Sequence, residues 1–410
     1  MTQTLALLHD AYRELNSKKL FWITLVLSAV VVAAFAGVGV NDNGISVFFW
    51  HIPIPGVNRT TLPPETFYKL GFVKFGIGMW LAWIATVLAL VSTAPIFPDF
   101  LAGGAVEMVL SKPIGRARLY LTKYAVGLLF VTLQVTVFTL ACFLVIGIRG
   151  GSWVPRLFLA VPIVVIFFSY LFSVCALLGT VTRSTIASLM GTLLLWFFIF
   201  LLNAADTSTL MFREHTAMEV EGLTKQIERM EANTTKTLDA KAAQPPTPDE
   251  NNTAPAEPAT SATAPTTPNT AGPPHYTQAE LDAANPFLPL KRRALEEAKS
   301  NNASLAKWNR LLVSVKTALP KTSETVEVLK RALLTKDEIT KFRAGDDSEP
   351  RPRRNRRNND EDLGIDEREV GSRVESVFDK RSVAWVMGTS LIFEGVVLAI
   401  GAWIFARRDF

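Results

Sequence analysis

The sequence alternates between six long apolar stretches and shorter polar segments. A helix needs about 20 mostly apolar residues to cross the ~30 Å hydrocarbon layer of a membrane. The stretches run approximately from Leu20 to Val40, Leu70 to Ser92, Tyr124 to Ile148, Arg156 to Leu178, Thr185 to Leu202 and Val383 to Ala406. Gly, Ser and Thr recur inside them, and such small residues let membrane helices pack closely. The pattern therefore predicts an all-α polytopic membrane protein with a six-helix transmembrane bundle.

The first 19 residues have a helical pattern of their own. Their apolar residues recur at helical spacing, namely Leu5, Leu8, Tyr12 and Leu15. This spacing suits a cytoplasmic amphipathic helix in the headgroup layer, although an ordinary cytoplasmic cap helix fits almost as well. A cleaved signal peptide would begin with a short basic segment, whereas this one is long and contains Asp10 and Glu14. We therefore expect the first apolar stretch to be retained as a span.

A polar insertion, residues 206–382, separates the fifth and sixth stretches. Helical periodicity is present at 212–231, 289–318, 323–334 and 365–381. Residues 233–275 are rich in Ala, Thr and Pro and lack the apolar content that would offset chain entropy, so we expect disorder there. Possible capping boxes begin at Thr277 and Thr335, and Asn285-Pro286 predicts a helix break. The insertion should be mostly helical and partly disordered.

The net charge of +5 over 410 residues is unevenly distributed. The insertion holds 27 Lys/Arg and 29 Asp/Glu, whereas the other 233 residues hold 15 and 8. This division excludes a single globular soluble domain. The short loops carry ten Lys/Arg on the side of the N-terminus and five on the other side, which predicts cytoplasmic termini and an extracytoplasmic insertion. A basic run at 351–357 has acidic flanks, so we interpret it as a charge-balanced linker and expect no nucleic-acid partner.

The chain therefore divides into four predicted parts. Residues 1–19 form the cytoplasmic amphipathic helix, and 20–205 carry spans 1–5 with a cytoplasmic loop at 94–120. Residues 206–382 form the insertion, and 383–410 carry span 6 and a cytoplasmic tail. Within these parts we find no P-loop, no G-x-S-x-G elbow, no H-E-x-x-H motif and no metal-ligand spacing among the four His and two Cys residues. The sequence thus offers no candidate catalytic, metal or cofactor-binding residues.

The loop at 94–120 has an apolar stripe that a simple connection does not need. A short amphipathic helix is expected between Gly103-Gly104 and Pro113, with Val106, Val109 and Leu110 on one edge. Such a helix suits docking into a groove of a partner protein. From the residues alone, packing against the chain's own bundle is the better interpretation.

The run from Phe97-Pro98-Asp99 through Gly104-Ala-Val-Glu107-Met-Val-Leu110-Ser-Lys112-Pro113-Ile-Gly-Arg116 resembles the signature of ABC-2 type transporter permeases, of the ABC-2 family-like and copper-processing permease kind. Ala105 and Gly115 depart from that pattern, in which Thr and Ser are usual. The entry from Tyr12 to Trp22 and the ending from Phe405 to Phe410 are also similar to the family. The resemblance covers the six spans and their cytoplasmic loops but not the insertion.

The resemblance implies that the loop is a coupling helix inserted into a separate ABC ATP-binding subunit, which would bind the ATP. A second permease subunit, in a homo- or heterodimer, would complete the pathway. This chain would then need no ATPase motif of its own and would not be an enzyme. The implied contacts are Asp99, Gly104, Glu107, Leu110, Lys112, Pro113 and Arg116.

One ionisable residue lies in the middle of a predicted span. A charge at Glu394 is costly unless it is paired, protonated or facing water, so this residue is a functional candidate. Gln134 in the third span and Lys74 in the second are its candidate partners. Two interpretations remain open: a protonated Glu394 that joins helices by hydrogen bonds, or a group in the transport path.

The sequence thus predicts the permease subunit of an ATP-driven transporter in the cell (inner) membrane, an exporter by family resemblance. The alternative is a membrane scaffold that anchors the insertion and transports nothing. An intramembrane enzyme has little support, because Glu394 has no catalytic partner in the sequence. The spans contain no array of charged or aromatic groups that would identify a substrate.

Overall fold

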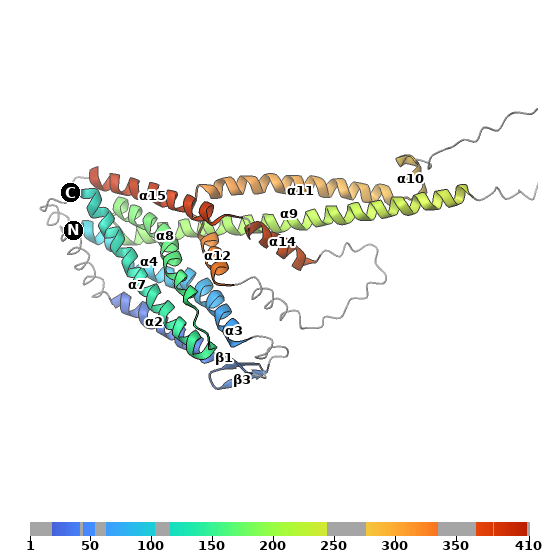
Figure 1. The fold of residues 1–410 in the computed structure, drawn as a ribbon. Coiled ribbons are helices and arrows are strands. Elements are labelled where there is room, and N and C mark those ends of the chain that lie inside the picture. Colours follow the sequence, from blue (N-terminus) through green and yellow to red (C-terminus); the bar gives the residue numbers. More distant parts are fainter. Residues whose placement is uncertain are drawn as a thin grey trace, which may run out of the picture. The chain divides into compact units, whose positions relative to one another are not determined.

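The computed structural model describes residues 19–41, 44–53, 63–102, 115–243, 276–334, 366–379 and 381–407. Within these ranges most residues are helical (Figure 1). The chain divides into two compact units. Unit 1 comprises Met1–Asp206, Leu311–Arg356 and Asp379–Phe410, and unit 2 comprises Thr207–Arg310 and Arg357–Phe378.

Unit 1 contains the apolar helices. Five helices are long and apolar enough to cross a membrane, namely Pro64–Leu101, Arg116–Gly150 (α7), Pro155–Thr182, Thr185–Ala242 (α9) and Val383–Arg407 (α15). The first of these is built from α3 (Pro64–Gly71), the π-helical η1 (Phe72–Ala85), α4 (Thr86–Thr93) and α5 (Ile96–Ala102). The third is built from η2 (Pro155–Leu159) and α8 (Ala160–Thr182). These helices confirm a helical membrane protein with several spans.

The helix at the position of the first predicted span is shorter than the sequence predicts. It corresponds to α2 (Lys19–Gly37), whose apolar part, Phe21–Gly37, is shorter than the other candidate spans. The predicted helix ends earlier than Val40, because three short antiparallel strands follow in an otherwise helical chain: β1 (Val38–Asn41), β2 (Gly44–Val47) and β3 (Trp50–Pro53). Val, Ile and Trp favour strands in this segment. The Tyr68 hydroxyl donates to the Val38 carbonyl at 2.7 Å and ties β1 to α3.

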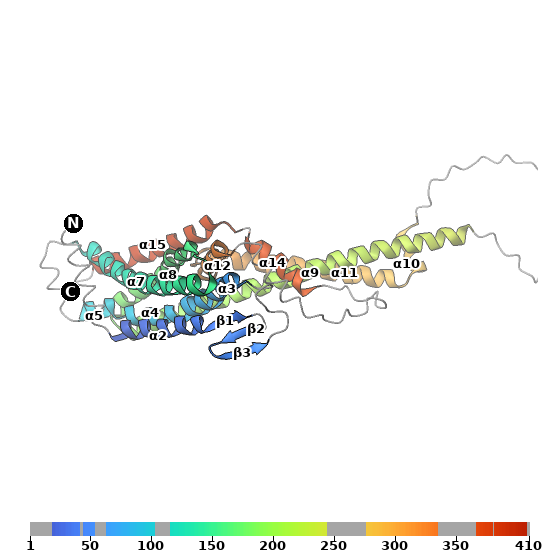
Figure 2. The same cartoon turned by 60° about the horizontal axis from the view of Figure 1, so that its bottom comes forward.

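The core of unit 1 lies between α7, α8 and the helix built from α3, η1, α4 and α5. The last helix, α15, packs against α7 and α8 (Figure 2). Glycines permit the close approach of these helices. A side chain at Gly127 of α7 would overlap the Phe172 ring, and one at Gly401 of α15 would overlap Tyr120. The interior therefore depends on small residues inside the spans, as the sequence predicted.

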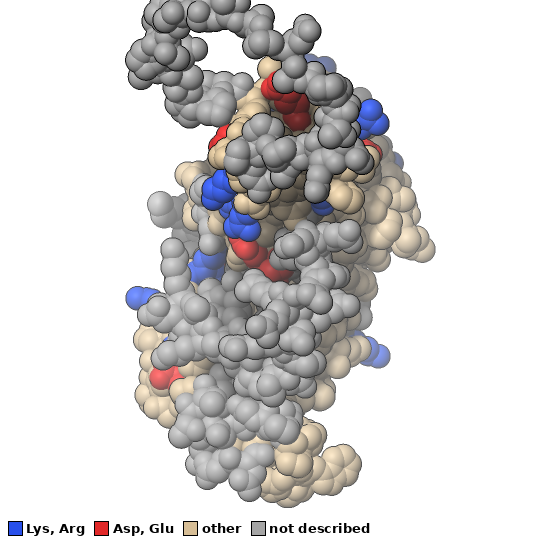
Figure 3. All heavy atoms as spheres, turned by 90° about the vertical axis from the view of Figure 1, so that its right-hand side faces the viewer, with Lys and Arg blue, Asp and Glu red and all other residues tan. Residues whose placement is uncertain are grey.

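Unit 2 is built from the remainder of α9, from α10 (Gln278–Ala284), from most of α11 (Phe287–Thr317) and from α14 (Glu367–Asp379). One apolar cluster joins Leu210 of α9 to Val370 and Val374 of α14. A second joins Ile227 of α9 to Leu281 and Leu288. Side chains of both charge signs are visible on the face of the molecule shown in Figure 3.

Several predictions for the insertion are confirmed. The predicted helices at 289–318 and 323–334 correspond to α11 and to α12 (Thr322–Leu333), and the break at Asn285-Pro286 separates α10 from α11. The capping box is present, since Glu280 Oε2 accepts hydrogen bonds from the Thr277 amide at 2.7 Å and from Thr277 Oγ1 at 2.9 Å. The predicted box at Thr335 and the basic run at 351–357 lie outside the described residues.

Other boundaries of the insertion differ. The predicted disorder at 233–275 is wrong for residues 233–242, which are helical, and 244–275 lie outside the described residues. The fifth span and the first helix of the insertion are one continuous helix, α9, because neither Gly nor Pro occurs between 193 and 221 to end it. About the last two turns of α11, from Leu311, and the whole of α12 belong to unit 1 with the apolar helices.

Candidate functional site

The predicted coupling loop is described only at its two ends. Gly104, Glu107, Leu110, Lys112 and Pro113 lie outside the described residues. The structure places Asp99 on α5, where it is exposed, and Arg116 at the first residue of α7. The structure therefore shows what holds the ends of this loop, while its middle stays a prediction.

The N-terminal end of the loop is anchored by aromatic side chains on α5. Phe97 and Phe100 are buried. The Phe97 ring lies 4.8 Å from the Tyr120 ring, and the Phe100 ring lies 6.3 Å from the Phe405 ring, between centroids. Pro98 packs closely on Gly179 of α8, where an added Cβ would lie 3.2 Å from the proline ring. Aromatic pairs at these separations stabilise packing beyond the area that they bury, so α5 is fixed to α7, α8 and α15.

The C-terminal end of the loop is anchored to the last helix of the chain. Arg116 Nη1 donates a hydrogen bond to the carbonyl of Ala406 at 3.1 Å. The last carbonyls of a helix have no partner within that helix, and a cation is favourable beside them. Arg116 therefore caps α15, a role that the sequence did not reveal.

Glu394 is buried between three helices, and its partners differ from those predicted. Tyr124 of α7 and Ser169 of α8 contact its two carboxyl oxygens at 2.8 and 2.7 Å. The Tyr124 hydroxyl also lies 2.9 Å from the Ser169 carbonyl, and Ser169 Oγ lies 2.8 Å from the Ile166 carbonyl. Neither Gln134 nor Lys74 hydrogen-bonds Glu394. The prediction of these two partners is therefore wrong.

The hydroxyls of Tyr124 and Ser169 each have two acceptors within reach, a carboxyl oxygen of Glu394 and a backbone carbonyl of α8. Each hydroxyl carries one hydrogen, and carbonyl oxygens only accept. Carbonyls inside a helix already accept a hydrogen bond from that helix, so both hydroxyls can donate to Glu394 without leaving a buried group unsatisfied. Glu394 thus joins α15 to α7 and α8.

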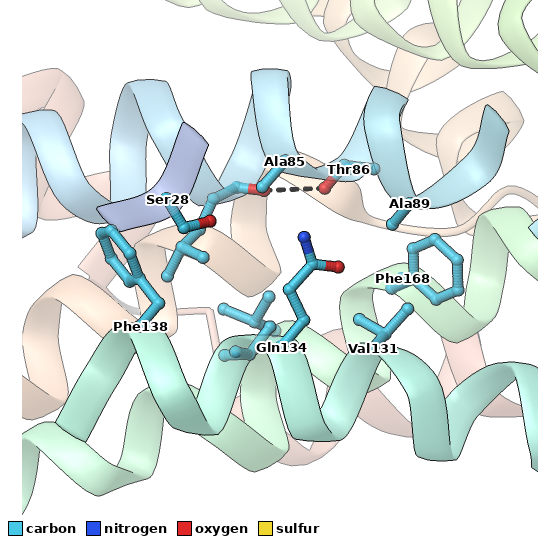
Figure 4. A pocket seen from close by; sticks show the side chains of 11 residues that line it. Ser28, Ala85, Thr86, Ala89, Val131, Gln134, Phe138 and Phe168 are labelled. Carbon is cyan, nitrogen blue, oxygen red and sulfur yellow. Dashed lines mark hydrogen bonds between the residues drawn. The ribbon is translucent and has the colours of Figure 1, made fainter. Parts of the chain in front are cut away.

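Gln134 points into a small internal cavity instead (Figure 4). It is 5% exposed, and neither polar atom of its side-chain amide has a hydrogen-bond partner among the described residues. The cavity measures about 10 Å³ and is also lined by Ser28 and Thr86. One water molecule needs about 10–15 Å³, so no organic substrate fits here.

The sequence did not reveal a buried ring of four alternating charges, which we call the ionic quartet. Lys316 of α11 contacts Asp206 of α9 at 2.9 Å and Glu324 of α12 at 2.5 Å. Arg381, just before α15, contacts the same two carboxylates at 3.2 and 2.8 Å. Asp206 is fully buried and Glu324 is 7% exposed. The quartet joins the interior of α9 to the end of α11, the start of α12 and the residues just before α15, all within unit 1.

Lys321 adds a fifth buried charge close to the ionic quartet. Its Nζ contacts Thr389 Oγ1 at 2.5 Å and lies 4.2 Å from the centroid of the Trp385 ring. Burial lowers the pKa of this lysine; Glu324 opposes the shift, whereas the neighbouring Lys316 and Arg381 add to it. The ammonium group of Lys321 is therefore stabilised by contacts with protein side chains in place of hydration.

A pocket of about 210 Å³ lies between η1, α8, α9 and α12. Its apolar side is aromatic, with Trp83 and Trp196 stacked at 5.0 Å between centroids. Its polar side carries Glu327 and Lys330 of α12, which form an ion pair at 3.0 Å. This pocket of mixed polarity is a candidate contact site for an amphiphilic molecule.

Comparison with protein-family models, with curated proteins and with solved structures finds no match. Among the described residues, no group of three or more His, Cys, Asp and Glu side chains could hold a metal ion.

Proposed function

We propose that this chain is the permease subunit of an ATP-driven ABC-2 type transporter, acting as an exporter. The loop at 94–120 would couple the membrane bundle to a separate ATP-binding subunit, which binds the ATP. In this proposal α2 is the first of six spans, both termini are cytoplasmic, the protein lies in the cell (inner) membrane, and a second permease subunit completes the pathway.

The observation that best supports the proposal is the double anchoring of the loop. Phe97 and Phe100 attach its first end to α7, α8 and α15, and Arg116 attaches its other end to α15. Protein interiors are close-packed and transmit strain. A partner that pushes on the middle of the loop would therefore move packed helices rather than a loose connection.

The test is ATP hydrolysis by the complex that the full-length chain forms with an ATP-binding subunit in lipid. Reversing the charge in the middle of the loop with Glu107→Lys should abolish association with that subunit and the ATPase stimulation. The matched control, Glu228→Lys on the exposed surface of α9, should leave both unchanged. If Glu107→Lys retains association and full stimulation, the coupling role is wrong.

A membrane scaffold is the second candidate, and one observation favours it. Unit 2 has two apolar clusters of its own, around Val374 and around Ile227, so its helices pack without the membrane bundle. If the chain is a scaffold, the bundle is an anchor, so deleting residues 213–305 should remove the activity and substitutions in the loop at 94–120 should not. If the chain is a transporter, substitutions in that loop should remove the activity.

A further inference from the structure

A large apolar groove runs along the surface of unit 1 between α2 and the helix formed by α3 and η1. Its volume is about 560 Å³, within the range of about 300–1,000 Å³ that is typical of small-molecule sites. Phe138 and Cys142 of α7 form its buried floor. Ala34 of α2 and Met79 of η1 are exposed along its rim. The groove is therefore open along its length and closed at its base.

The lining of the groove suits a ligand that has one charged end and one apolar chain. Among the described residues that line it, Lys74 is the only charged one, and it is exposed. The other lining residues are apolar side chains, glycines and Cys142. Lysine buries its methylene stem against apolar surface and keeps its ammonium group at the polar boundary. An occupant would therefore place an anionic group near Lys74 and an apolar chain along the floor.

The setting of the groove points to lipid. Its floor and one wall belong to helices that are long and apolar enough to cross a membrane. Ile45 of β2 also lines it, and the tip that follows this strand exposes Phe49 and Trp50, at 92% and 78%. Exposed aromatic side chains are characteristic of the membrane–water interface. The groove thus begins where a phospholipid has its phosphate and continues where its acyl chains lie.

We propose that this groove binds one phospholipid, with an acyl chain along Phe138 and Cys142 and the phosphate beside Lys74. A helix of a second copy is a poorer occupant. A helix about 10–12 Å wide fills roughly 400–600 Å³ per turn, so the groove would take about one turn. Nor would such a helix supply an anion at the depth of Lys74. This inference does not depend on transport.

The experiment uses the full-length protein in nanodiscs of phosphatidylcholine that contain a phosphatidylglycerol with a photoactivatable group in its acyl chain. After illumination, labelled peptides are mapped by mass spectrometry. Ala34→Trp fills the groove from its rim, and Ala33→Trp adds the same side chain at the next exposed position of α2, outside the groove. Lys74→Gln removes the charge, with Arg156→Gln as its control.

The wild type and Ala33→Trp should carry label on the peptides that contain Phe35 and Cys142, and Ala34→Trp should lose it. Lys74→Gln should lower that labelling roughly tenfold, the value of one charge-assisted contact, while Arg156→Gln should not. The proposal would be overturned if Ala34→Trp left the labelling unchanged. It would also be overturned if the exposed face of α9 were labelled equally, because the label would then report contact with bulk lipid only. Disulfide cross-linking of Ala34→Cys chains would overturn it too, since a second copy would then cover the groove.

Discussion

The ionic quartet makes Asp206 the residue whose neutralisation should be most damaging outside the apolar core. Asp206→Asn keeps the shape of the side chain but removes its charge. Lys316 and Arg381 would then share Glu324 as their only partner in the quartet, and the net charge of the four groups would change from zero to +1. Because Asp206 is fully buried, water cannot compensate for that change.

The expected loss can be bounded from the structure. Removing one partner of a buried ion pair costs about 3–5 kcal/mol, because the other charge stays buried without compensation. In the double variant Asp206→Asn/Lys316→Met, Glu324 and Arg381 remain as one neutral pair at 2.8 Å. The double variant should therefore be about 0.5–3 kcal/mol more stable than the sum of the two single effects predicts.

The assay is equilibrium unfolding of the purified full-length protein in mixed micelles, with all variants measured in parallel. Glu221→Gln is the control, because Glu221 also contacts two cations, at 2.8 and 3.3 Å, but on the exposed surface of unit 2. Its loss should be much smaller, since exposed ion pairs contribute little. The account of the quartet is refuted if Asp206→Asn costs no more than Glu221→Gln, or if the two single effects simply add.

Three further predictions concern single residues. The lowered pKa of Lys321 means that the unfolded chain binds more protons between that pKa and the ordinary value of 10.5. Wild type should therefore gain stability relative to Lys321→Met as the pH rises through this window in unfolding titrations, and a flat difference would exclude the effect. Glu394→Gln should keep the wild-type stability in the same assay, whereas Glu394→Leu should lose about 1–3 kcal/mol; equal losses would argue for a charged carboxylate. The Thr277 amide, with the Thr277 hydroxyl, lowers the pKa of Glu280, so the cap stabilises α10 above the ordinary pKa of a glutamate and fails as the pH falls through the lowered value. The protection of the α10 amides, measured relative to the intrinsic exchange rate at each pH, should decrease in wild type as the pH falls over that range. In Glu280→Ala the protection should be low at every pH.

Much of the fold could be predicted because it depends on local patterns. An apolar run of 20 residues is visible in sequence order, and so is the capping box at Thr277, whose partners are three residues apart. The helix break at Asn285-Pro286 follows from the covalent structure of proline alone. Each of these features is determined by neighbours along the chain.

The features that could not be predicted depend on distant partners. Asp206 and Lys316 are 110 residues apart, and nothing near either residue distinguishes it from a surface charge. Glu394 could be identified as a charge inside an apolar span, but its partner Tyr124 is 270 residues away and could not. The strands at 38–53 were missed for a different reason, because short apolar runs rich in Val fit either a strand or the end of a span.

The site around Glu394 also has a consequence for the order of events during synthesis. Ser169 precedes Glu394 by 225 residues, which is roughly 10–45 s of translation at 5–20 residues per second. During that interval the Tyr124 and Ser169 hydroxyls can already donate to the carbonyls of Ser169 and Ile166. The hydroxyls of α7 and α8 are therefore hydrogen-bonded before α15 is synthesised. Once α15 has inserted, the same hydroxyls can donate to Glu394 and so link the three helices.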